Sequence, residues 1–251
     1  TTEKVLFNKY DLVVIANLDF IPQDKVKVLE QWANAGGGIL IFLGDKVDRT
    51  NYNDLLYKNG AGLLPAQLGE IKGDKSHQQA FKMDRIDFNH PALTFFNNIP
   101  DRLRSMLIYE YYTTTVSDTS SASPQAVPVH RSASRLEWLI GASVLIRLND
   151  PDATPLMIEK PYGQGRIVLV TTSADTEWNM MAARQGYVVL IDQISMNLVR
   201  AQDQMIIRNI QVGDTILWQL NPALDAGDLA PPTNFLLTTP RRGMMLLSTV
   251  P

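Results

Sequence analysis

A strand–helix–strand pattern near the amino terminus constrains the fold more than any other feature of the chain. Residues 12–18 form a nearly continuous apolar run rich in β-branched side chains, which is typical of a strand buried on both faces of a parallel sheet. A second run of this kind occupies residues 39–43. Between the two runs, apolar residues recur at helical spacing, namely Val26, Leu29, Trp32 and Ala33. This order of elements predicts a right-handed βαβ crossover.

Three consecutive glycines, at residues 36–38, mark the end of the predicted helix. Glycine tolerates the left-handed conformation that closes a helix, so we expect at least one of the three to have a positive φ. Trp32 lies on the same helical face as Val28 and Leu29, and we expect its ring to be buried against the sheet.

The sequence up to residue 200 contains patterns that predict further strands and one long helix. Alternating or apolar runs predict strands at 81–88, 106–116, 144–148, 155–159 and 166–172. An amphipathic helix is expected at 187–199, with a buried side made of Val188, Leu190, Ile191, Ile194 and Leu198. Two stretches rich in small or polar residues, 58–76 and 117–128, are expected to be surface loops, the second of them mobile.

Together these elements predict an α/β chain with two parts. Residues 1–202 are expected to form a flavodoxin-like, three-layer sandwich around a mostly parallel sheet. After residue 202 the helical pattern ends, and short strand candidates follow at 206–210, 215–218 and 235–237. Residues 203–251 are therefore interpreted as a small all-β segment or an incomplete domain.

Composition excludes several classes of chemistry. The 251 residues include no cysteine, which removes disulfides, thiolate metal sites and cysteine nucleophiles. The formal net charge is −3 with no long block of one sign, which argues against a nucleic-acid surface. No apolar run reaches the ~18 residues needed to span a bilayer, so we expect no direct insertion into a membrane.

Polar residues after three of the predicted strands form the candidate binding site. Ligands of open α/β sheets bind at the carboxyl ends of strands, and three such ends would meet at one edge of the sheet. The candidate residues are Asn17, Asp19, Gly44, Asp45, Lys46, Ser173, Asp175, Glu177 and Trp178. The alternative interpretation is that these residues only form turns and cap helices, where Asp and Asn are common.

Catalysis at this edge would need a nucleophile with a base within hydrogen-bond reach. Ser173 is the candidate nucleophile, but none of the three histidines, His77, His90 and His130, belongs to a motif with it. Asp175 and Glu177 are paired carboxylates without a third metal ligand. We therefore expect no catalytic residue, no metal ligand and no cofactor, and recognition by backbone amides and carboxylates.

Several short pieces of the chain form a recognisable set. They are residues 10–14 with Asn17, the Trp32 helix with its three glycines, Asn89-His90-Pro91, residues 155–156, residues 162–169, and residues 171–175 with Trp178. As a set, they resemble the class I glutamine amidotransferase-like domain of long bacterial membrane proteins that also carry a Bat-type membrane region and a von Willebrand factor A domain. The resemblance spans roughly residues 5–200 and implies the α/β fold of that family.

The resemblance does not extend to activity. Amidotransferases of this class place a cysteine on a sharp turn after one strand and a His-x-Glu pair after a later strand. The corresponding stretches here read Phe42-Leu43-Gly44-Asp45-Lys46 and Ser173-Ala174-Asp175-Thr176-Glu177. Because neither the nucleophile nor the histidine is present, we expect no glutaminase activity.

The sequence therefore favours a non-catalytic binding or interaction domain with a degenerate amidotransferase-like site. Through the resemblance, its expected setting is the soluble portion of a larger, membrane-anchored bacterial protein, with the periplasmic side preferred. The expected partners are another protein or neighbouring domains of the same chain, and not nucleic acid. Two alternatives stay open: a divergent hydrolase acting through Ser173 or Asp45, and a sugar- or nucleotide-binding module.

Overall fold

The computed structural model describes residues 9–74, 76, 78–116, 141–199, 234–238 and 244–248. The chain divides into two units, Thr1–Gln204 and Met205–Pro251, and each is described by itself. The strands expected at 206–210 and 215–218 and the loop expected at 117–128 lie outside the described residues.

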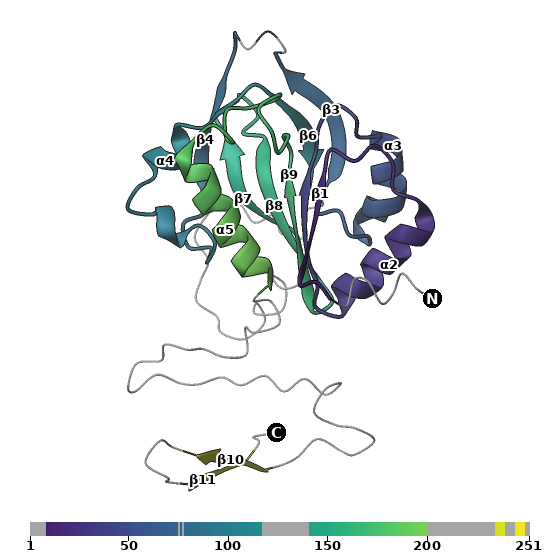
Figure 1. Cartoon of the computed structure of the whole chain (residues 1–251), viewed down its shortest axis with the longest axis vertical. Coiled ribbons are helices and arrows are strands. Elements are labelled where there is room, and N and C mark those ends of the chain that lie inside the picture. The colour runs from purple at the N-terminus through teal and green to yellow at the C-terminus, as the bar shows by residue number, and fades with distance from the viewer. Residues whose placement is uncertain are drawn as a thin grey trace, which may run out of the picture. The chain divides into compact units, whose positions relative to one another are not determined.

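A seven-stranded mixed sheet forms the centre of the first unit (Figure 1). From one edge to the other, its strands are β1 (Leu12–Ala16), β2 (Gly38–Phe42), β9 (Gly165–Val170), β8 (Pro155–Tyr162), β7 (Ser143–Leu148), β4 (Phe81–Ile86) and β5 (Leu107–Ile108). The β1–β2 and β2–β9 pairs are parallel, and the pairs from β9 to β5 are antiparallel. A separate antiparallel pair joins β3 (Gln67–Gly73) and β6 (Glu110–Thr115).

The α/β class is confirmed, but parallel pairing is confined to β1, β2 and β9. Short turns connect β7 to β8 and β8 to β9, and a tight turn can join only antiparallel neighbours. The expectation of a mostly parallel sheet therefore fails beyond β9, and the flavodoxin-like, three-layer arrangement stays a prediction.

The predicted βαβ crossover is present. Helix α2 (Gln23–Asn34) connects β1 to β2, and Gly36 has a φ of 113°, as expected for a glycine after a helix end. Trp32 is 9% exposed, and a Cβ added to Gly37 would lie 2.4 Å from its ring. A side chain at position 37 would therefore collide with the indole ring, so glycine is required there. The low exposure of Trp32 confirms the burial expected for its ring.

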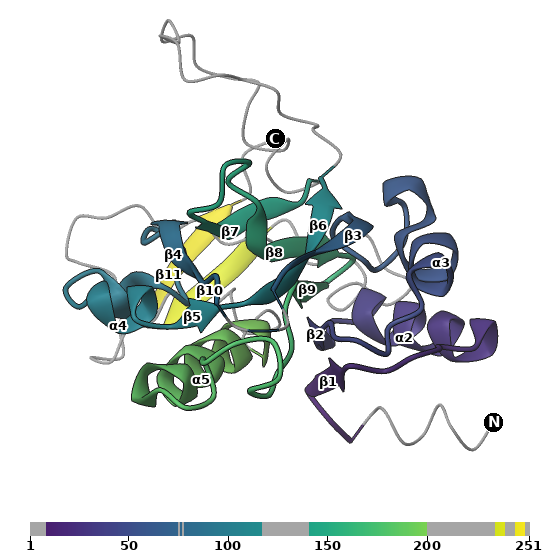
Figure 2. The same ribbon diagram turned by 90° about the horizontal axis from the view of Figure 1, so that it is seen from above.

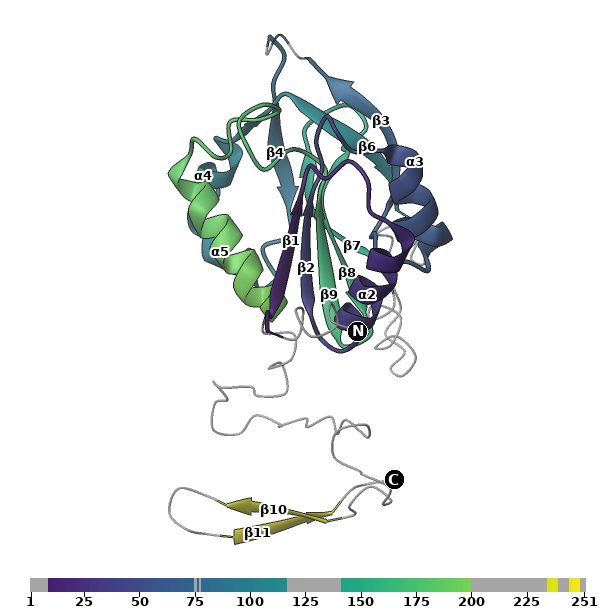
Figure 3. The same cartoon turned by 45° about the vertical axis from the view of Figure 1, so that its right-hand side comes forward.

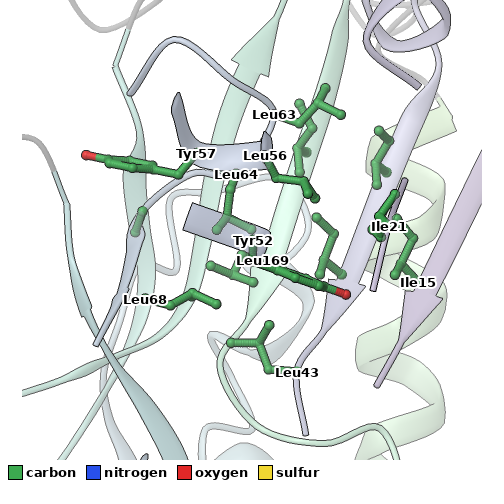
Figure 4. Close-up of a cluster of buried hydrophobic side chains, with 14 of the residues drawn as sticks. Ile15, Ile21, Leu43, Tyr52, Leu56, Tyr57, Leu63, Leu64, Leu68 and Leu169 are labelled. Atoms are coloured by element: carbon green, nitrogen blue, oxygen red, sulfur yellow. The ribbon is translucent and has the colours of Figure 1, made fainter. Parts of the chain in front are cut away.

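Helices cover both faces of the sheet (Figure 2). One face carries α2, α3 (Arg49–Asn51), the π-helical turn Tyr52–Tyr57 and the 3₁₀ turn Lys58–Gly60, while the other carries α4 (Asp101–Arg104) and α5 (Gln185–Val199), near the 3₁₀ turn Thr94–Phe96. Alternate residues of β2 serve the two cores: Ile39 and Ile41 belong to the first, and Leu40 and Phe42 to the second. Figure 4 shows the first core, where Tyr52, Leu56 and Leu64 cover the sheet.

Three local expectations were wrong. β1 was expected to be buried on both faces, but it is an edge strand, and Val14 is 54% exposed. Part of the loop expected at 58–76 is strand β3, which pairs with β6. Val188 was placed on the buried side of its helix, whereas it is 70% exposed and α5 buries Leu190, Ile194 and Leu198.

The described part of the second unit is one antiparallel hairpin, formed by β10 (Asn234–Thr238) and β11 (Met244–Ser248). The strand expected at 235–237 lies within β10, and β11 was not predicted.

Candidate functional site

The carboxyl ends of β1, β2 and β9 lie side by side at one edge of the sheet, as Figure 3 shows for the three strands. Asn17 N donates to Phe42 O at 3.0 Å, and Leu43 N donates to Val170 O at 3.2 Å, so the parallel ladders run to the last residue of each strand. The loops that begin at Asn17, Gly44 and Ser173 therefore leave the sheet from the same edge.

Two of these loops are joined through Asn17. Its side-chain amide donates to Asp45 Oδ1 at 2.8 Å, and its Oδ1 accepts from Lys46 N at 3.0 Å. Asn17 itself has a φ of 47°, a conformation that asparagine adopts more readily than most residues. A Cβ at Gly44 would lie 2.3 Å from Asn17 Cγ, so the absence of a side chain at 44 makes this contact possible. The Asp48 amide also donates to Asp19 O at 2.9 Å, which ties the two loops a second time.

The third loop holds Ser173 as a buried structural group. Ser173 is 1% exposed, and its Oγ accepts from Trp178 N at 3.3 Å and from Asn179 Nδ2 at 3.3 Å. The hydroxyl lies 3.4 Å from Asp175 O, to which it donates. These partners are backbone groups and a carboxamide, and none is a base.

The candidate residues therefore separate by exposure. Trp178 packs in the first core, with its ring centroid 5.7 Å from that of Tyr112, and cannot serve as a surface contact. Asp175 Oδ1 accepts from Glu177 N at 3.0 Å, which is the turn-forming role of the alternative interpretation. The exposed members of the set are Asp19, Asp45, Lys46, Asp175 and Glu177, whereas Gly44 and Ser173 are buried and Asn17 is half-buried.

A buried polar cluster that the sequence analysis missed lies between the sheet and α5. Glu159, on β8, has one carboxylate oxygen 3.0 Å from His90 Nε2 and 3.3 Å from Arg166 Nη1. Its other oxygen accepts from Asn197 Nδ2, on α5, at 3.0 Å. Because His90 Nδ1 accepts from Ala92 N at 3.3 Å, Nε2 is the ring nitrogen that carries hydrogen and donates to Glu159.

The cluster lowers the pKa of the Glu159 carboxyl group. Burial alone would raise the pKa of Glu159, but the hydrogen bond that His90 donates and the positive charge of Arg166 outweigh burial and hold that pKa below its ordinary value. His90 lies in the turn before Pro91, and its side chain also crosslinks that turn to the sheet.

Lys160 follows Glu159 on β8, and its positive charge lies on the opposite face of the sheet. Lys160 Nζ donates to Gly60 O at 2.5 Å and to Gly62 O at 2.7 Å, and burial lowers its pKa. These carbonyls belong to a turn in which Lys58 and Asn59 both have left-handed φ values, 48° and 52°. The ammonium therefore fixes a turn whose backbone conformation is unfavourable for residues with side chains. A Glu-Lys pair inside an otherwise apolar strand is the sequence signal that could have located both groups.

Among the described residues, no group of three or more His, Asp or Glu side chains could hold a metal ion.

No protein-family model matches the chain, and no curated protein matches its sequence. Two solved structures share its fold: cytoplasmic protein STM3548 from Salmonella typhimurium, with 16% identity and a TM-score of 0.55, and cytoplasmic protein STM1381 from Salmonella typhimurium LT2, with 13% identity and a TM-score of 0.54. Each alignment covers 78% of this chain and 74% of the other. The mmIFT52 N-terminal domain aligns over 79% of this chain and 80% of its own length, with 13% identity and a TM-score of 0.47.

These comparisons overturn the resemblance inferred from sequence. The two Salmonella proteins, which match with TM-scores above 0.5, are described as cytoplasmic proteins and not as glutamine amidotransferase-like domains, and no family model supports that assignment. The short pieces that suggested it lie in β1, in α2 and its glycines, in the turn at His90, at the start of β8, in the β8–β9 hairpin and in the loop after β9. The expectation of a membrane-associated parent protein came through that resemblance and is overturned with it. The expectation of a periplasmic position had the same source and has no support of its own. Within the described residues, no helix is both long and apolar enough to cross a bilayer.

Proposed function

We propose that this chain is a non-catalytic interaction domain that binds its partner at the carboxyl-end surface, defined as Asn17, Asp19, Gly44, Asp45, Lys46, Asp175 and Glu177. One observation carries the proposal. The candidate nucleophile Ser173 is buried and hydrogen-bonded to backbone and carboxamide groups, while the charged side chains of the same loops are exposed. The edge thus offers polar groups to a partner without a nucleophile and base in contact.

The charge of this surface selects the chemistry of the partner. Asp19, Asp45, Asp175 and Glu177 are exposed carboxylates, and Lys46 is the exposed cation among the residues of the surface. An excess of carboxylates favours Lys- or Arg-bearing partners and repels phosphate-rich ones. The partner is therefore expected to be a basic segment of another protein or of a neighbouring domain.

Backbone-amide NMR on the isotope-labelled full chain tests this proposal. A Lys/Arg-rich peptide should shift the amide signals of residues 44–46 and 175–177, while an acidic peptide of equal length should not. Asp45→Asn and Asp175→Asn should each weaken binding by about threefold to tenfold, because a charge-assisted contact is lost. Asp84→Asn, which removes an exposed carboxylate from β4 in the antiparallel part of the sheet, is the matched control.

Assays of the same full chain distinguish the two alternatives, a hydrolase and a sugar- or nucleotide-binding module. Turnover of ester or amide substrates that Ser173→Ala abolishes would establish a hydrolase and contradict the proposal. Signals of the carboxyl-end surface that respond to a sugar or a nucleotide, and not to the basic peptide, would replace the protein partner with a small molecule. A ligand that binds only the folded state at 100 times its dissociation constant should add about 2.7 kcal/mol to the free energy of unfolding.

A further inference from the structure

The outer edge of β1 carries exposed apolar side chains on a strand that is paired on one side only. Among the described residues, β1 pairs with β2 alone. Four of the large exposed apolar side chains occur between residues 10 and 20: Tyr10, Val14, Leu18 and Phe20. Soluble proteins usually protect such an edge with an inward-pointing charge, a proline or a bulge, and residues 12–16 read Leu-Val-Val-Ile-Ala.

The free backbone hydrogen-bonding groups of β1 belong to its even-numbered residues, which include the exposed Val14. Asp11 O accepts from Gly38 N at 3.1 Å and Asn17 N donates to Phe42 O at 3.0 Å, so the odd-numbered residues face β2. Backbone groups alternate along a strand, and the N–H and C=O of Leu12, Val14 and Ala16 therefore point away from β2. The side chains of these three residues share one face of the strand.

We propose that this edge pairs with the β1 edge of a second copy of the chain, antiparallel and about a two-fold axis at Val14. In this register, Val14 faces Val14 of the second copy, and Leu12 faces Ala16. Both are hydrogen-bonded pairs in an antiparallel ladder, because the free groups belong to the even-numbered residues. The two seven-stranded sheets would then form one continuous sheet.

Charge selects this register over its neighbours. With Val14 on the axis, the start of β1 in each copy lies beside the end of β1 in the other, where the chain turns at Asn17. Asp11 then lies toward Asn17, and Lys9 lies near the loop that carries Asp19; all four residues are outside the ladder, at its two ends. A shift of the pairing by two residues in one direction brings Asp11 instead of Lys9 near that loop, which would set like charges together. The opposite shift moves Lys9 away from Asp19. A self-complementary patch of this kind is what a two-fold interface requires.

This inference is separate from the proposed function. It uses the outer edge of β1, whereas the carboxyl-end surface uses the loops after β1, β2 and β9, and only Asn17 and Asp19 are common to both. Peptide binding detected by NMR and self-association detected by mass can therefore succeed or fail independently.

Cysteine crosslinking gives the sharpest test, because the chain contains no cysteine and any introduced thiol is the only one. Hydrogen-bonded antiparallel partners have Cα atoms about 5.5 Å apart, which is within the range that a disulfide can bridge. Val14→Cys should therefore form a covalent dimer of the full chain under mild oxidation. Ala16→Cys is the matched control, since its two copies would be about 14 Å apart along the strand, beyond reach.

Sedimentation equilibrium of the unmodified full chain provides the independent measurement. The weight-average mass should rise from one copy toward two with concentration, and Val14→Lys should keep it at one copy, while Val188→Lys on α5 should not. Lys9→Glu should weaken the dimer about threefold to tenfold, and Lys9→Glu combined with Asp19→Lys should restore it. A chain that stays monomeric at every concentration, a dimer that Val14→Lys leaves intact, or equal crosslinking at positions 14 and 16 would overturn the proposal.

Discussion

The buried cluster around Glu159 and the carboxyl-end surface hold their charges in different ways. Glu159 has three side-chain partners, from the turn at His90, from β9 and from α5, and it is closed from solvent. Asp45 has one side-chain partner, Asn17, and is exposed. A buried charge must have its hydrogen bonds satisfied inside the protein, whereas an exposed one is satisfied by water. The first group therefore belongs to folding, and the second is available for recognition.

Removal of Glu159 is expected to have the largest effect. Glu159→Ala leaves His90, Arg166 and Asn197 without their common partner, and loss of one member of a buried ionic cluster costs about 3 kcal/mol or more. For a unit of roughly 200 residues, this corresponds to a fall in Tm of about 6–12 °C. Urea or thermal unfolding of the full chain measures it. Glu159→Gln, which keeps an acceptor and the side-chain shape, should cost less. If the unfolding free energy of Glu159→Ala were within about 0.5 kcal/mol of that of the unmodified chain, Glu159 would matter no more to folding than the exposed Asp45.

Replacement of Lys160, which lies on the opposite face of the same strand, should have the next largest effect on the free energy of unfolding. Lys160→Met removes the donor to Gly60 O and Gly62 O, and an unsatisfied buried carbonyl costs about 1–3 kcal/mol. Because the variant also removes an ammonium whose burial is unfavourable, we expect a net loss of about 1–2 kcal/mol, measured by urea unfolding. Lys58→Met is the matched control. Lys58 forms a partly exposed ion pair with Glu30, so its loss should cost less than about 1 kcal/mol.

Acid should remove the contribution of Glu159 gradually. Its folded-state pKa is depressed, so the stabilisation is fully present above the unfolded-state pKa and is lost as the pH falls through the folded-state value. The difference in unfolding free energy between the unmodified chain and Glu159→Gln should therefore shrink below about pH 4.5. Urea midpoints of both proteins between pH 7 and pH 3 measure it. A difference that grows as the pH falls would show that the carboxylate is not held in its charged form.

The part of the fold that the sequence predicted is the part set by local pattern. The period of the apolar residues identified β1, α2 and β2, and the glycines identified the helix end at Gly36. β3 was missed because its sequence, Gln-Leu-Gly-Glu-Ile-Lys-Gly, is largely exposed and begins and ends with residues that are common in loops. The edge position of β1 could not be predicted, since strand order depends on pairings with residues far along the chain.

The sequence predicted that the three candidate loops lie together, but it did not predict the contacts within them. The residues after β1, β2 and β9 do leave the sheet at one edge, which follows from parallel strands, yet the sequence did not separate the buried Ser173 from the exposed Asp175. Glu159 was missed because its partners are 69, 7 and 38 residues away, and no local pattern records such distances.

Asp45→Ala should change the free energy of unfolding least, and its difference from Glu159→Ala tests directly whether the two carboxylates have separate roles. Asp45→Ala removes the acceptor of the Asn17 amide, but this hydrogen bond is exposed, and water can replace the lost oxygen. We expect a loss of less than about 1 kcal/mol, measured by urea unfolding beside Glu159→Ala. Gly44→Ala supplies the matched control, because its Cβ would displace the Asn17 side chain and break both bonds of that residue, and it should cost more. If Asp45→Ala destabilises as strongly as Glu159→Ala, the Asn17–Asp45 contact is a structural crosslink. The carboxylate at 45 is then committed to the fold, and the proposal that it binds a basic partner loses its main support.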